Sequence, residues 1–293
     1  MTRAATVAVR QTPKPAEEIM RSNNPVFNRS EEFNRSGGAA YQDFGQQYDG
    51  YAQPGSPTTE SRTQGRMTID SVVQSTAITL GITMIAAIAT WLVTPEITPE
   101  TGIPSSLLAA VTLGSGAAFI LSLVNSFKRV ISPALVIAFA VAEGVAMGAL
   151  SELFNAVYGG SIIVQAVLGT FAAFAGTLAA YKFFDIQVGN KFRTFVIAAM
   201  FGMVALSLLE VVLGMFGGNN LGLFEDGMLG LVFAIAGLVL GVFMLILDFD
   251  FVERGVAAGI PERESWRAAF GLLVSLVWIY TNLLRILAIL QSD

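Results

Sequence analysis

The sequence has no cysteine and no histidine, and only 13% of its 293 residues are charged. The first two absences exclude disulfides, thiol nucleophiles, imidazole bases and the zinc sites that need either residue. The low charge excludes a water-soluble protein, because such proteins carry about a quarter charged residues. No basic stripe accompanies the formal charge of −5, so we expect no nucleic-acid partner. Any proton or metal chemistry in this chain must therefore use carboxylates.

Apolar residues make up 54% of the chain and gather in seven long runs. Each run can cross a hydrocarbon core of about 30 Å as a helix, and the unbroken hydrophobicity excludes a transmembrane β-barrel, whose strands alternate. Short connections make successive helices antiparallel neighbours. The sequence therefore predicts an all-α, multi-pass protein in a lipid bilayer. The predicted spans are 71–93, 105–126, 132–155, 161–181, 194–217, 227–249 and 266–290.

Residues 1–67 have a different composition from the rest of the chain. They are rich in Asn, Ser, Gly, Gln and Pro, and they lack the apolar periodicity that would offset the entropy of ordering. Their first residues also lack the apolar region of a secretory signal. We expect a disordered tail over 1–67, followed by the seven-helix membrane domain over 68–293.

Lysine and arginine lie in the tail and on every second connection, and they are missing from the connections between. The basic residues in question are Arg62, Arg66, Lys128, Arg129, Lys182, Lys191, Arg193, Arg254, Arg263 and Arg267. Retained positive charge marks the cytoplasmic side of a membrane. This pattern predicts a cell (inner) membrane protein with its N-terminus in the cytoplasm and its C-terminus outside. The acidic outer connections either concentrate cations or are simply solvated.

Few ionisable residues lie inside the spans, where a charge exposed to lipid costs several kcal/mol and therefore faces the bundle interior or water. Glu143 falls near mid-membrane, where it is either protonated or ionised in a water-filled cavity. Glu152, Glu210 and Arg285 fall at a similar depth toward the outer side. We expect these three to form a charge-paired cluster, which either fixes helix packing or contributes to transport.

Asp248 and Asp250 stand in LILDFD, where the sixth span ends. Residues two apart lie about 200° apart around a helix, so both cannot face one ion while the helix continues. We expect one of them to point inward and the other to face the interface. The alternative is that both are ordinary polar residues at the end of a span.

Three segments, EGVAMG, LILDFD and TNLLRILAIL, resemble the Bax inhibitor-1 family of membrane proteins over residues 68–293. The N-terminal SNNPVF and the loop LDFDFVERGVAAGIPERESWRAAFG are similar to its bacterial branch. The resemblance implies a seven-helix fold with the last helix in the middle of the other six. It also implies a pH-sensitive leak with calcium as the transported ion, and no cofactor.

The resemblance further implies two aspartates that share a proton and close the pore, one at the end of the sixth helix and one in the seventh. Asp248 matches the first, but Ser275 occupies the second position, which therefore lacks the family carboxylate. Asp250 is the other possible partner for Asp248, although the helix geometry argues against direct contact. Lys128 or Arg129 matches a basic residue that the family pairs with its aspartates.

Two functions of different classes are consistent with these features. The first is a passive cation leak gated by protonation of Asp248 and Glu143, with Glu152 and Glu210 as further oxygen ligands along the path. The second, implied by a bacterial relative, is a membrane regulator that binds another membrane protein such as an ATP-dependent membrane protease. We expect no enzyme, because the groups that intramembrane catalysis needs are missing.

Overall fold

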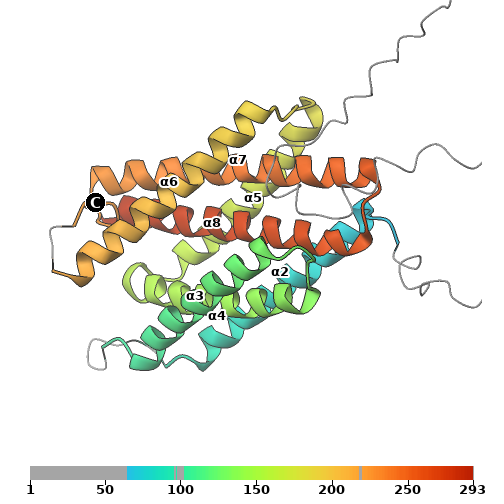
Figure 1. The fold of residues 1–293 in the computed structure, drawn as a ribbon. Helices are drawn as coiled ribbons and strands as arrows, with labels where there is room; N and C mark the ends of the chain where they lie inside the picture. Colours follow the sequence, from blue (N-terminus) through green and yellow to red (C-terminus); the bar gives the residue numbers. More distant parts are fainter. Residues whose placement is uncertain (1–64, 96, 98–101, 218–219, 293) are drawn as a thin grey trace, which may run out of the picture. The chain divides into compact units, whose positions relative to one another are not determined.

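The structure, a computed structural model, describes residues 65–95, 97, 102–217 and 220–292. This part of the chain holds seven α-helices that are long and apolar enough to cross a membrane (Figure 1). They are α2 (Ile69–Val93), α3 (Ser105–Phe127), α4 (Pro133–Tyr158), α5 (Ser161–Phe183), α6 (Asn190–Met215), α7 (Met228–Ala258) and α8 (Ser265–Ser292). A short 3-10 helix, η2 (Glu262–Glu264), precedes α8. The prediction of an all-α membrane protein is confirmed. The predicted tail lies outside the described residues except for 65–67.

Local capping explains where α2 begins and where α7 ends. At the start of α2, Thr68 and Ser71 form a capping box, each side chain accepting a hydrogen bond from the other's backbone N–H. At the end of α7, Gly259 adopts the left-handed conformation (φ 61°) that stops a helix. α7 runs to Ala258, nine residues past the predicted end of the span at 249. The additional turns keep Asp248 and Asp250 inside one continuous helix.

The last helix, α8, lies at the centre of the described helices, as the resemblance implies. It packs on α2, α4, α5 and α7, and Figure 1 shows it crossing the bundle between α7 and the α3 and α4 pair. Half of its most apolar stretch is buried, the largest share among the seven described helices. Leu272, Leu276 and Ile279 of α8 share one core cluster with Leu245 and Phe249 of α7. A displacement of α8 would therefore alter its packing against several neighbouring helices.

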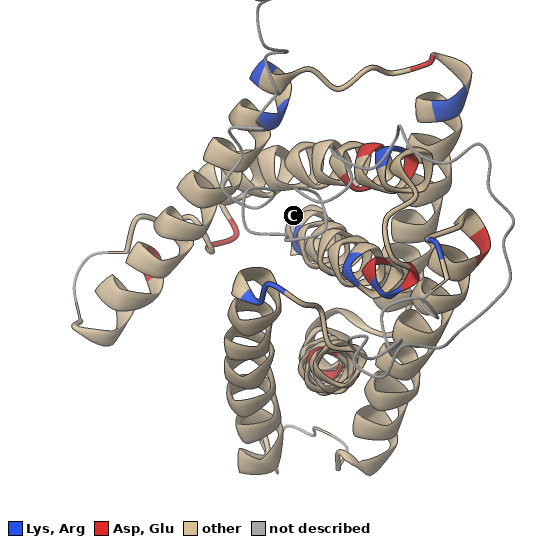
Figure 2. Cartoon of the chain, turned by 45° about the vertical axis from the view of Figure 1, so that its right-hand side comes forward, with Lys and Arg blue, Asp and Glu red and all other residues tan. Residues whose placement is uncertain are grey.

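The basic connections meet at one end of the bundle, as three contacts demonstrate. The Met67 N–H donates to the carbonyl of Ile260, which ties the start of α2 to the α7–α8 connection. Arg254 donates to the carbonyl of Val188 between α5 and α6. Arg267 donates to the carbonyls of Lys128 and Arg129 between α3 and α4. Figure 2 shows most of the lysines and arginines at helix ends and on the connections.

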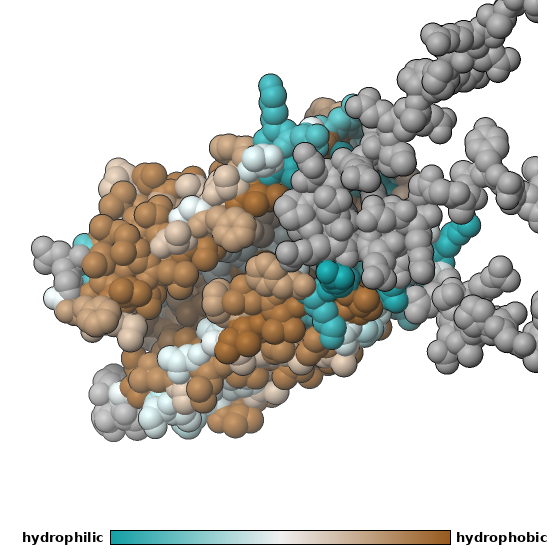
Figure 3. Space-filling model, viewed as in Figure 1, coloured by the Kyte–Doolittle hydropathy of each residue, from teal (hydrophilic) through white to brown (hydrophobic). Residues whose placement is uncertain are grey.

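The sides of the helices present apolar side chains outward. Figure 3 shows this apolar surface along the bundle, with hydrophilic residues gathered toward the end that carries the basic connections. Ile85, Leu113 and Leu168 are each more than 60% exposed. Large apolar side chains exposed in this way suit contact with lipid chains, because exposing an apolar side chain to hydrocarbon costs no free energy.

Candidate functional site

Asp248 of α7 contacts α8 through Ser275. The Ser275 hydroxyl donates a 2.5 Å hydrogen bond to Oδ2 of Asp248, and Ser275 itself is buried. Gly271 lies one turn before Ser275, and a Cβ atom placed there would approach Oδ1 of Asp248 to 2.8 Å. The carboxyl group therefore fits into a notch on α8 made by a glycine and a serine four residues apart. Asp248 is half-buried in this position.

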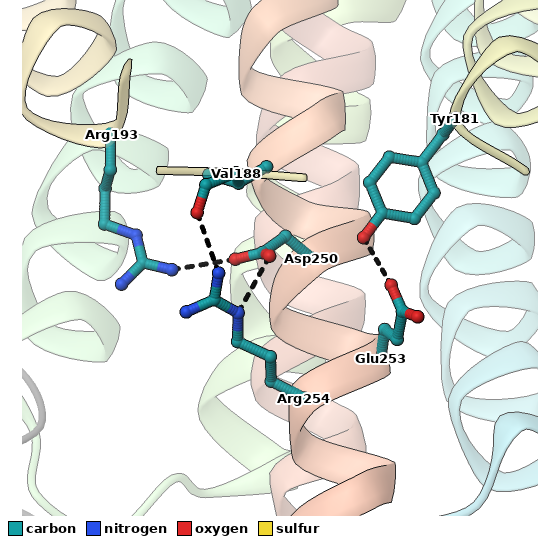
Figure 4. A network of polar contacts seen from close by, with 6 residues as sticks. All are labelled: Tyr181, Val188, Arg193, Asp250, Glu253 and Arg254. Carbon is teal, nitrogen blue, oxygen red and sulfur yellow. Dashed lines mark hydrogen bonds and ion pairs between the residues drawn. The ribbon is translucent and has the colours of Figure 1, made fainter. Parts of the chain in front are cut away.

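Asp250 faces a different side of α7 and lies between two arginines (Figure 4). Its Oδ2 is 2.7 Å from Nη2 of Arg193 on α6, and its Oδ1 is 2.8 Å from Nε of Arg254 one turn later on α7. Arg254 also donates to the carbonyl of Val188. Asp250 is 4% exposed, so two cations compensate a nearly buried carboxylate. This group of contacts joins α6, α7 and the α5–α6 connection.

A second contact in the same region joins α5 to α7. The Tyr181 hydroxyl donates a 2.5 Å hydrogen bond to Oε2 of Glu253 (Figure 4). Glu253 contacts α5 and Asp250 contacts Arg193 of α6, so the last turns of α7 hold partners on both flanking helices. These contacts explain why α7 stays helical through the charged residues beyond the predicted span.

Glu210 and Arg285 both bind the connection between α6 and α7, without an ion pair between them among the contacts of the described residues. The carboxylate of Glu210 accepts hydrogen bonds from the backbone N–H groups of Leu221, Gly222 and Leu223 at 2.8 to 3.2 Å. Arg285 donates to the carbonyl of Leu223. Its guanidinium also lies over the rings of Phe224 and Phe233. The expected charge-paired cluster is therefore replaced by two charges that fix one loop.

Glu152 and Glu143 occupy two further positions on α4. Glu152 is buried, and Nδ2 of Asn155 donates to its Oε2 over 3.3 Å. Glu143 is half-buried, and no hydrogen bond or ion pair to it occurs among the described residues. Gly144, beside it, faces the backbone of α2 at Thr83, which shows how closely α4 approaches that helix. Glu143 thus precedes a tight helix contact in sequence and has no cationic partner in the described part.

The acidic residues lie outside the apolar cleft of the bundle. A cleft of about 520 Å³ lies between α2 and α5 over α4 and α8, and none of its lining residues is acidic. Among residues 65–95, 97, 102–217 and 220–292, no three carboxylates gather as a metal site would require. Asp248, Asp250, Glu143, Glu152 and Glu210 instead occupy separate positions with different partners.

A comparison with family models matches residues 24–292 to the Bax inhibitor 1 like family. The chain belongs to this family. The match covers all seven membrane helices and extends into the segment before α2. A comparison with curated proteins finds no match.

Within the Bax inhibitor 1 like family, the position opposite Asp248 is the one for which the resemblance implies a second carboxyl group. Ser275 occupies it here and reaches Asp248 directly. The basic partner that the resemblance implies differs as well. Lys128 and Arg129 are exposed, and it is their carbonyl groups that accept hydrogen bonds from Arg267. The arginines that do contact an aspartate, Arg193 and Arg254, pair with Asp250.

Sequence reasoning missed the arginine pair around Asp250. The contact of Asp250 with Arg254 could have been predicted, because the two residues are four apart and such pairs meet on one helix face. The contact with Arg193 could not, since Arg193 stands 57 positions before Asp250 in the chain. The partnership of Glu210 with a loop backbone was equally hidden, because backbone donors carry no residue-type signature.

Proposed function

We propose that this membrane protein of the Bax inhibitor 1 like family is a passive cation leak, not an enzyme, with calcium as the transported ion. In this proposal the charge of Asp248 sets the packing of α7 against α8 and so opens or closes the path. The observation that supports it is the contact of Asp248 with Ser275, a neutral residue on the central helix. Placing a carboxyl group inside a membrane bundle costs free energy, so such a group is by default a candidate for an ion or proton path.

The partners of the other acidic residues favour Asp248 as the responsive group. Asp250 is held by two arginines, Glu210 by three backbone N–H groups and Glu152 by Asn155. The carboxylates of Asp250 and Glu210 are therefore each held by two or more donors, and that of Glu152 by one. Asp248 has one hydroxyl donor and no cationic partner among the described residues, so its charge is less compensated than those of Asp250 and Glu210.

Glu143 is the second candidate along the path. It is half-buried on α4, the helix that packs on α2, α3 and α8, and it has no cationic partner in the described part of the chain. A leak needs weak successive oxygen sites more than one tight cage, and separated carboxylates meet that need. We propose that cations pass Glu143 and reach Asp248 near the end of the bundle with the basic connections, which we assign to the cytoplasm.

Flux measurements in proteoliposomes test the proposal. Purified protein would be placed in vesicles with a calcium indicator inside, and calcium entry would be followed at acid and alkaline pH. Asp248→Asn keeps the shape of the side chain but holds it neutral, so its flux at every pH should match the wild-type flux at acid pH. Asp70→Asn, which neutralises an exposed aspartate at the start of α2, is the matched control and should keep the wild-type pH response. Identical flux from wild type and the double variant Asp248→Asn, Glu143→Gln would reject the proposal.

A regulatory role through a second membrane protein, such as an ATP-dependent protease, is the alternative proposal. The observation that favours it is the family match, which begins at residue 24 and so includes much of the segment before α2. Deleting residues 1–64 spares Met67, which is buried against the helices. Loss of partner capture with unchanged calcium flux in that variant would favour regulation. Loss of flux in Asp248→Asn with capture unchanged would favour the leak.

A further inference from the structure

The apolar cleft of about 520 Å³ between α2 and α5 takes no part in the proposed ion path. One wall is a stripe along a single face of α2, with Leu80, Thr83, Ala87 and Trp91 among its residues. The opposite wall is a matching stripe on α5 that includes Val167. The spacing of three and four residues places each set on one side of its helix. The floor is formed by α4 and α8, on which both wall helices pack.

The length of the cleft matches one leaflet of a bilayer. From Leu80 to Leu92 the α2 wall rises about 18 Å, at about 1.5 Å per residue. Half of a hydrocarbon core of about 30 Å is about 15 Å. The cleft begins where α2 ends at Val93 and α5 starts at Ser161, and it stops near the middle of α2. It therefore runs from one membrane surface to about the midplane.

The hydroxyl groups that line the cleft are already satisfied by the protein. The hydroxyl of Thr83 donates to the carbonyl of Thr79, and the hydroxyl of Thr170 donates to that of Ala166. The Ser151 hydroxyl has a single proton and donates it to the carbonyl of Met147. The Tyr280 hydroxyl, 2.6 Å from Oγ of Ser151, must then be the donor of that pair. An occupant consequently finds no hydroxyl group to satisfy, and the indole N–H of Trp91 lies only at the outer end of the cleft, which favours a hydrocarbon chain over a polar ligand.

The rim of the cleft is open to the surrounding lipid. Met84, Ile88 and Val164 line it and are 43%, 55% and 58% exposed. Trp91 lies two residues before the end of α2, at the level where aromatic rings meet lipid headgroups. We propose that the cleft binds one acyl chain of a phospholipid from the adjacent leaflet, with the headgroup beside Trp91. This lipid site does not depend on the proposed ion leak.

Two neighbouring positions on α5 provide a test with a matched control. Val167 lines the cleft, whereas Leu168 does not and is 64% exposed on the lipid-facing side. Wild type, Val167→Trp and Leu168→Trp would be released from phosphatidylcholine nanodiscs with one oleoyl chain per lipid and weighed by native mass spectrometry. Wild type and Leu168→Trp should retain one phospholipid. Val167→Trp fills the cleft and should lower the lipid-bound fraction about fivefold or more, since overpacking costs about 1–3 kcal/mol.

A second pair on α2 covers the case in which Val167→Trp does not fold. Ala87→Phe fills the cleft from the other wall, and Ile85→Phe changes an outward residue that is 70% exposed. In the wild-type protein, a phospholipid with a photoreactive group in its oleoyl chain should label Ala87 and Val167 more than Ile85 and Leu168. Equal lipid retention in all variants together with uniform labelling would overturn the proposal. So would a wild-type dimer that the cleft-filling variants abolish, because a second copy would then be the occupant.

Discussion

Asp248 and Asp250 stand two residues apart on α7 and bind partners on different helices. Asp248 accepts a hydrogen bond from Ser275 on α8, and Asp250 forms ion pairs with Arg193 on α6 and Arg254 on α7. α7 stays continuous through both residues, so their side chains point about 200° apart. One helix turn therefore links the central helix on one side to the basic connections on the other.

Replacing Ser275 by alanine removes the donor to Asp248. Hydrogen bonds between membrane helices contribute about 0.6 kcal/mol on average and up to about 1.7 kcal/mol. We expect Ser275→Ala to lower the free energy of unfolding within that range, measured by denaturation in mixed micelles. Ser122→Ala is a control, because its hydroxyl bonds to the carbonyl of Phe119 within its own helix. A loss as small as that of the control would mean that the Asp248 contact adds no stability.

Replacing Ser275 by aspartate would put two carboxyl groups at hydrogen-bond distance. Interacting carboxyls lose their protons in two steps that belong to the pair. If Asp248 controls the leak, the flux of Ser275→Asp should change in two steps across the pH range, where wild type changes in one. Calcium entry into proteoliposomes over a fine pH series measures this. A profile that superimposes on that of wild type would separate the leak from Asp248.

The arginines around Asp250 should differ in importance. Asp250→Ala removes the ion pairs that Asp250 forms with both arginines, and breaking a buried pair costs about 3 kcal/mol or more. The side chain of Arg254 is 55% exposed, so losing its ion pair in Arg254→Ala should cost no more than about 1 kcal/mol. Arg193, whose side chain is 20% exposed, should lie between them. The order of unfolding midpoints in detergent tests this, and equal effects for both arginines would contradict it.

Glu210 should control the order of the connection between α6 and α7. Alanine in its place leaves the N–H groups of Leu221, Gly222 and Leu223 without their acceptor, which should cost about 1–3 kcal/mol. Hydrogen exchange at these three amides should speed up in Glu210→Ala while exchange in α8 stays unchanged. Glu225→Gln, an exposed acid on the same connection, is the control. Because Arg285 binds the same loop, the double change with Arg285→Ala should cost less than the sum of the two.

Hydropathy and charge were enough to predict the seven membrane-spanning helices and the shared end of the basic connections, and helix periodicity was enough to predict that Asp248 and Asp250 point apart. These properties follow from the order of residue types along the chain, without knowledge of which helix faces pack together. The register of Arg254 against Asp250 was readable on the same basis, four residues apart.

Only the tertiary structure decided which helix faces meet. A helix that is apolar on all sides suits lipid and protein equally, so its rotation about its own axis is not encoded in its hydropathy. The notch of Gly271 and Ser275 opposite Asp248, the pairing of Arg193 with Asp250, and the binding of one loop by Glu210 and Arg285 all depend on that rotation. The cleft between α2 and α5 depends on it too, because its walls are two apolar stripes that packing leaves apart.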